Sequence, residues 1–115
     1  MDEIVNRIFD IAKQHEKKNL VEIALKGSEE MGELAQAVLS YQKCPGCEYK
    51  KLGLSKVAEE ACDVIIVAMA LLSKADVSKD VMKVILNDKL DKWFNKTVEA
   101  SSNDLSEILE SNKND

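Results

Sequence analysis

Apolar residues recur along most of the chain at intervals of three and four positions, which is the spacing of one face of a helix. The pattern is interrupted at Asn19, at the Cys44-Pro-Gly-Cys47 segment and around 76–78, where turn-forming residues gather. No segment of the sequence alternates as a half-buried strand does. The pattern therefore predicts an all-α fold with helices at roughly 2–18, 20–42, 54–74 and 79–100.

Four helices with short connections favour an antiparallel four-helix bundle formed by residues 1–100. Residues 101–115 are polar, and we expect them to form a tail with a short helix that starts near Asn103. The apolar positions expected to face the core include Ile4, Phe9, Ile23, Met31, Val38, Ile65, Leu72, Ile85, Leu90 and Trp93.

The length of 115 residues suits one domain with a single core. The third predicted helix also carries Ile66, Val67 and Met69 outside its main apolar stripe. An apolar arc of this width predicts a second buried face, and hence a homo-oligomer.

The net charge of −5 argues against a protein that binds a nucleic-acid polymer through its phosphates. The first residues lack the pattern of a signal peptide, and the longest apolar run, 64–72, is too short to span a bilayer. Three cysteines do not describe a disulfide framework. We therefore expect a cytoplasmic protein with no membrane association.

An acidic pattern occurs twice in the chain. Glu29-Glu30-Met31-Gly32-Glu33 is followed thirty positions later by Glu59-Glu60-Ala61-Cys62-Asp63. Residues three apart share a helix face, so each segment directs a pair of acids to the same flank of its apolar stripe. Packed core to core, the two helices would bring these acids into one cleft, where a hard divalent metal would relieve their repulsion.

An acidic pair on one helix usually faces solvent, and this alternative applies to each pair taken alone. Two observations weaken it. The pattern occurs twice with the same phase, and no basic residue stands four positions after any of these acids. Those positions hold Leu34, Ala37, Val64 and Val67.

Residues 26–35, Lys-Gly-Ser-Glu-Glu-Met-Gly-Glu-Leu-Ala, followed by 59–64, Glu-Glu-Ala-Cys-Asp-Val, resemble the EExxE and ExxD motifs of the MazG-like all-α nucleoside triphosphate pyrophosphohydrolases. The resemblance covers roughly residues 1–98. It implies hydrolysis of a (deoxy)nucleoside triphosphate to the monophosphate and pyrophosphate. It also implies Mg²⁺ or Mn²⁺ as cofactor and a homodimer or homotetramer.

The resemblance carries over to particular acids. Glu30, Glu33, Glu60 and Asp63 would be the metal ligands. Glu29 matches the leading acid of the motif, where it would orient the attacking water or a second metal; its alternative is a glutamate that faces solvent.

Basic residues would assist with the phosphates. Lys26 precedes Glu30 by one turn, and it would contact a phosphate or only pair with Glu30. On the fourth helix, Lys89 and Lys96 match basic positions of the family, whereas Lys92 suits a solvated face. Trp93 departs from the asparagine of several relatives, which weakens phosphate binding by this helix; we expect it in the core rather than stacked on a base.

Three other functions remain open. A phosphoribosyl-ATP pyrophosphohydrolase would need more basic residues, and Arg7 is the single arginine. A non-catalytic helical regulator would use the acids only for metal-stabilised assembly. A zinc-linked module would use Cys44 and Cys47. Cys62 is expected to be a small packing residue between metal ligands, and His15 a surface residue.

Overall fold

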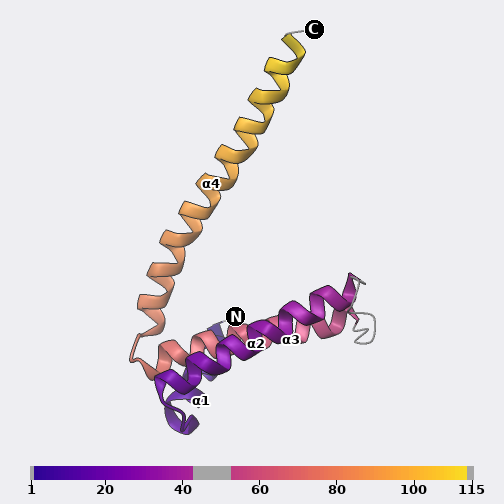
Figure 1. Cartoon of the computed structure of the whole chain (residues 1–115). Helices are drawn as coiled ribbons and strands as arrows, with labels where there is room; N and C mark the ends of the chain where they lie inside the picture. Colours follow the sequence, from indigo (N-terminus) through magenta and orange to yellow (C-terminus); the bar gives the residue numbers. More distant parts are fainter. Residues whose placement is uncertain (1, 43–52, 114–115) are drawn as a thin grey trace. The chain divides into compact units, whose positions relative to one another are not determined.

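The computed structural model describes residues 2–42 and 53–113. All regular structure in these ranges is helical, as the sequence predicted. The Cys44-Pro-Gly-Cys47 segment lies outside the described residues, so the zinc alternative stays a prediction. The four helices are α1 (Asp2–His15), α2 (Leu20–Tyr41), α3 (Leu54–Lys74) and α4 (Lys79–Lys113) (Figure 1).

The chain divides into two compact units, one built from α1, α2 and α3, and one formed by α4 from Asp80 onward. Within the first unit, α3 contacts both α1 and α2. Helices α2 and α3 lie side by side and run in opposite directions (Figure 1). This pair carries the two acidic segments. The arrangement of all four helices as one bundle stays a prediction.

Helix α2 begins with a capping box. The Asn19 Oδ1 accepts a 2.9 Å hydrogen bond from the Glu22 backbone N–H, and the Glu22 Oε1 accepts a 3.1 Å bond from the Asn19 N–H. These bonds satisfy two backbone donors that the first helical turn leaves free. The predicted break at Asn19 is therefore confirmed, although α1 ends at His15 rather than at Lys18.

Helix α3 ends in a Schellman motif. The Val77 N–H donates to the Leu72 carbonyl at 3.0 Å, and the Asp76 N–H donates to the Ser73 carbonyl at 3.1 Å. Asp76 adopts the left-handed conformation that this motif requires, with φ of 59°. The turn confirms the predicted break before α4, which starts at Lys79 as expected.

Helix α4 is longer than the sequence predicted. It runs without interruption for 35 residues to Lys113, so the expected end near Ala100 and the separate short helix from Asn103 were wrong. The physical reason is that residues 79–113 contain neither glycine nor proline, so no strong terminating residue stops the helix.

Few apolar side chains are fully buried. Several residues expected in the core are largely exposed instead, because three packed helices cover only part of each apolar arc, and α4 has no second helix within its own unit. Trp93, with 68% of its surface exposed, is the clearest case. The buried apolar residues are Val5, Phe9, Ala12, Ile23, Ala37 and Met82. The exposed ones among the predicted core residues are Ile4, Met31, Val38, Ile65, Ile85, Leu90 and Trp93.

No described helix combines the length and the apolar character needed to cross a membrane.

Candidate metal centre

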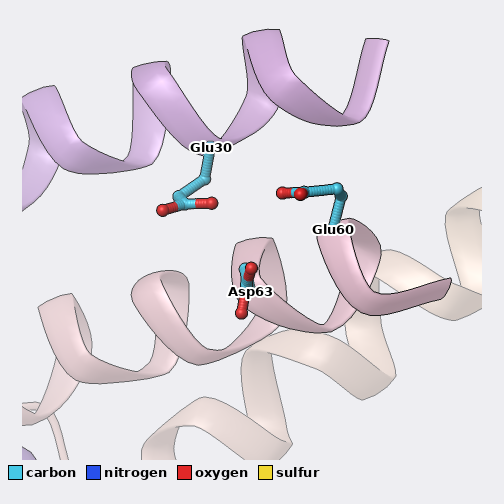
Figure 2. A group of neighbouring side chains, drawn as sticks. All are labelled: Glu30, Glu60 and Asp63. Carbon is cyan, nitrogen blue, oxygen red and sulfur yellow. The ribbon is translucent and has the colours of Figure 1, made fainter. Parts of the chain in front are cut away.

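The two acidic segments meet where α2 packs against α3. Glu30 extends from α2 toward α3, and Glu60 and Asp63 project from α3 (Figure 2). One carboxylate oxygen of each residue lies within 4.8 Å of the others. Glu30 and Glu60 are buried, with only 7% and 6% of their surface exposed to solvent, whereas Asp63 is exposed. Three of the four predicted metal ligands are thus brought together at one point.

The burial of Glu30 follows from its place on α2. Ile23, Glu30 and Ala37 are all buried, and they stand seven residues apart along the helix. Seven residues is the repeat of a helix–helix contact. The prediction that Glu30 stands on the flank of the apolar stripe was therefore wrong, because the packed stripe includes it. One turn earlier, a Cβ added to Gly27 would lie 3.4 Å from the Val67 Cγ1, which shows how closely the helices approach.

Two carboxylate oxygens at this contact are buried without a partner in the part of the chain that the structure describes. The Oε2 atoms of Glu30 and Glu60 are buried, and neither has a hydrogen-bond partner among the described residues. A buried charged oxygen without a partner is costly, and such groups in proteins are normally paired or bound to a metal. The arrangement therefore suits a cation held between the two helices.

The other oxygen of each buried glutamate is held by a lysine. The Lys26 Nζ lies 3.1 Å from the Glu30 Oε1, and the Lys56 Nζ lies 3.0 Å from the Glu60 Oε1. The Lys26–Glu30 pair agrees with one of the two alternatives weighed for Lys26. The search for basic partners four positions after the acids missed the Lys56–Glu60 pair, because both lysines stand four positions before their glutamates. The overlooked signal was the repeated order Lys-x-x-Glu-Glu, which begins at Lys26 and again at Lys56.

The outer acids of the two motifs occupy matching positions. Glu29 and Glu59 are exposed, and they lie 3.6 Å and 3.8 Å from Lys26 and Lys56, respectively. Each lysine therefore bridges one buried and one exposed carboxylate of its own helix. The role of Glu29 in orienting water stays a prediction.

The charges of the centre shift several pKa values. The negative charge of Glu30, with desolvation and the charge of Glu60, raises the pKa of Glu33. Glu33 therefore lies within the field of the acidic group, although it is not one of the three residues whose oxygens converge. Hydrogen bonds to Glu30 and Glu60 raise the pKa of Lys26 and Lys56, respectively, because the ammonium form is stabilised.

The predicted phosphate-binding lysines of the fourth helix belong to the second compact unit. Lys89 and Lys96 are exposed on α4, which belongs to the second unit. Their contact with a phosphate stays a prediction.

A largely apolar groove between α1 and α3 was not predicted. It encloses about 670 Å³, and Cys62, His15 and Ile66 are among its lining residues. Cys62 is exposed there, so its predicted role as a packing residue was wrong. His15 is exposed, as expected.

No family model, curated protein or solved structure matches the chain. The chemistry of the centre must therefore be argued from its atoms. All three converging groups are carboxylates, and oxygen ligands of this kind suit hard divalent ions such as Mg²⁺ and Mn²⁺. The described group contains neither the thiolates nor the imidazoles that zinc favours.

Proposed function

We propose that this protein is a magnesium-dependent nucleotide pyrophosphohydrolase. It would hydrolyse a (deoxy)nucleoside triphosphate to the monophosphate and pyrophosphate. The observation that carries the proposal is the convergence of Glu30, Glu60 and Asp63 within 4.8 Å, with a buried unpartnered oxygen on each glutamate. The resemblance of the two acidic motifs to the MazG-like family supplies the substrate class.

In this proposal Glu30, Glu60 and Asp63 hold the metal, and Glu33 completes the ligand set. A bound divalent ion supplies charge stabilisation to phosphoryl oxygens and lowers the pKa of a coordinated water. Glu29, at the exposed edge of the centre, orients the attacking water. The contribution of this chain is to hold the carboxylates in a fixed arrangement between two packed helices.

The substrate phosphates carry several negative charges beside an acidic centre, so cationic side chains must assist. Lys26 stands at the edge of the centre, and Lys89 and Lys96 of α4 would complete the phosphate contacts if the four helices form an antiparallel bundle. The many exposed apolar side chains support a homodimer or homotetramer, because assembly would cover them. We propose Mg²⁺ as the resident ion, with Mn²⁺ as a substitute, and a cytoplasmic location.

The test is pyrophosphate release from a panel of canonical and modified nucleoside triphosphates and phosphoribosyl-ATP, with magnesium and with EDTA. Asp63→Asn should lower turnover by at least about 100-fold, because removal of a ligand should cost no less than loss of a supporting contact around a metal. Glu99→Gln, an exposed acid on α4, is the matched control and should retain activity. Release that survives EDTA or Asp63→Asn would refute the proposal.

A second candidate is a non-catalytic protein in which the metal only stabilises assembly. It is argued from the large apolar side chains exposed on every described helix, because assembly would cover them against a partner surface without any catalysis. This candidate predicts magnesium-dependent oligomerisation in sedimentation experiments with no turnover of any nucleotide in the panel.

A further inference from the structure

The two halves of the metal centre share an order of residues that extends beyond the acids. Lys26, Glu29, Glu30 and Glu33 on α2 correspond to Lys56, Glu59, Glu60 and Asp63 on α3. The ion pairs correspond as well: the lysine lies 3.1 Å from the buried glutamate in one half and 3.0 Å in the other. Each of the two helices thus places a lysine ammonium group, from four positions earlier, beside its own buried carboxylate.

We propose that Lys26 and Lys56 are internal competitors of the metal. In the metal-free protein their ammonium groups hold Glu30 and Glu60, and they leave these carboxylates when a divalent ion binds. The inference rests on the proposed metal centre, but it does not require catalysis. It assigns a role to Lys56, which the sequence analysis did not select.

The first argument concerns charge. Glu30, Glu60 and Asp63 carry three negative charges, and the two ammonium groups offset part of this charge in the metal-free protein. A divalent ion at the unpartnered Oε2 atoms of the same two carboxylates would stand close to both ammonium groups and repel them. The repulsion is strengthened because the two glutamates are buried, where water screens charges poorly.

The second argument concerns which groups are able to move. The side chains of Lys26 and Lys56 are 41% and 44% exposed, whereas those of Glu30 and Glu60 are 9% and 7% exposed. An ammonium group released from the carboxylate can be hydrated at once, because lysine is a compact charge on a flexible stem. The carboxylates of Glu30 and Glu60 are buried, so they cannot move into water in the same way. The lysines are therefore the partners that leave, and their ammonium groups become available to an anionic ligand at the rim.

The test measures binding of Mn²⁺ to the full chain in the absence of nucleotide, from the electron paramagnetic resonance of the free ion. Lys26→Met and Lys56→Met should each lower the dissociation constant of the metal by roughly two- to five-fold, the range expected when a competing ion pair is removed. Lys92→Met is the matched control. It breaks a 3.1 Å lysine–aspartate pair with Asp88 on α4, and it should leave the metal affinity unchanged.

Lys56→Arg tests the same idea without loss of charge. A guanidinium group can hold a carboxylate through two N–H donors, so it is harder to displace than an ammonium group. The dissociation constant should therefore rise, opposite to the effect of Lys56→Met. This pair of variants separates competition from a general disturbance of the fold, which would weaken metal binding in both.

The outcomes are distinct. Mn²⁺ binding that is unchanged or weakened in both methionine variants would overturn the inference and leave the metal centre intact. Wild-type Mn²⁺ binding with the expected lysine effects, but without pyrophosphate release, would overturn the proposed enzymatic function and support the inference. A wild-type protein that binds no Mn²⁺ would overturn both.

Discussion

The Ser73 Oγ of α3 donates a 2.7 Å hydrogen bond to the backbone carbonyl of Phe9 on α1, and the bond is buried. Such a bond between helices links segments 64 positions apart in the sequence. It therefore fixes the position of α1 along α3 in a way that apolar contacts alone, which are not directional, do not.

Ser73→Ala should lower the free energy of unfolding by about 1 kcal/mol, because it removes one buried hydrogen bond. Chemical denaturation measures this change. Thr97→Ala is the control: the Thr97 Oγ1 donates to the Trp93 carbonyl at 2.9 Å, but this bond is local and exposed. If both substitutions have equal effects, the link between α1 and α3 is not the source of the stabilisation.

Magnesium should raise the melting temperature of the wild-type protein, because a ligand that binds only the folded state stabilises it. Saturation at about 100 times the dissociation constant corresponds to about 2.7 kcal/mol. Glu60→Gln should abolish most of this increase, since the substitution removes a buried carboxylate from the centre.

Glu59→Gln is the matched control for this experiment. Glu59 is adjacent in sequence but exposed, and it is not one of the converging acids. The magnesium-dependent increase in melting temperature should persist in this variant. An equal loss in both variants would indicate a general effect of negative charge on α3 rather than a defined site.

The ionisation of Glu16 should contribute to the pH dependence of the free energy of unfolding. Its carboxylate accepts a 3.0 Å hydrogen bond from the Lys18 backbone N–H, and this bond lowers its pKa below the usual 4.5. The folded state thus favours the ionised form. The resulting stabilisation is present above about pH 4.5, and it is lost as the pH falls through the lowered pKa.

Glu16→Gln should therefore lower the melting temperature at pH 7 and have a smaller effect near pH 3. The difference in melting temperature between the wild type and Glu16→Gln at each pH removes the contribution of the other titrating groups, which both proteins share. A difference that grows toward low pH would contradict the assignment.

Asp76 occupies a conformation that glycine adopts more easily. Its φ of 59° lies in the left-handed region, where a side chain costs energy and glycine does not. The left-handed conformation costs an L-residue about 1–2 kcal/mol, and the entropic cost of a glycine is about 0.5–1 kcal/mol. Asp76→Gly should therefore raise the free energy of unfolding by roughly the difference, 0.5 to 1 kcal/mol. The substitution also removes an exposed 3.3 Å ion pair with Lys13, which is worth little.

Lys13→Met measures that ion pair separately, because it removes the same contact and leaves the backbone of residue 76 unchanged. Its effect on the free energy of unfolding should be small. If Asp76→Gly destabilises the protein more than Lys13→Met, the left-handed turn is not strained by its aspartate.

The positions at which helices begin could be predicted from local residues. Asn19, a residue type that caps helices, correctly indicated the start of α2. The starts of α3 at Leu54 and α4 at Lys79 also agree with the sequence pattern. The end of α4 was not predicted correctly, because no local residue marks it. Polar residues after Ala100 suggested a boundary, but polarity does not stop a helix in the absence of glycine or proline.

The tertiary environment of the acids was predicted only in part. The repeated spacing correctly indicated that acids of α2 and α3 would meet, because a helical face can be read from the sequence. The sequence could not show that Glu30 and Glu60 would enter the contact itself. Hydrophobic patterns place charged residues outside a packed stripe, and only the approach of two particular helices decides otherwise.

Gly27 permits the close approach of α2 and α3 beside the proposed metal centre. It stands one turn from Glu30, and its lack of a side chain allows the backbone of α2 to approach Val67 of α3. An alanine would just be accommodated, but a larger side chain would force the two helices apart. Mg²⁺ binds oxygens at about 2.0–2.1 Å and Ca²⁺ at about 2.3–2.6 Å. If the proposed centre holds a divalent ion, the spacing of α2 and α3 at this glycine would set which ionic radius fits, and enlargement of this one residue should shift the preference from the smaller ion toward the larger.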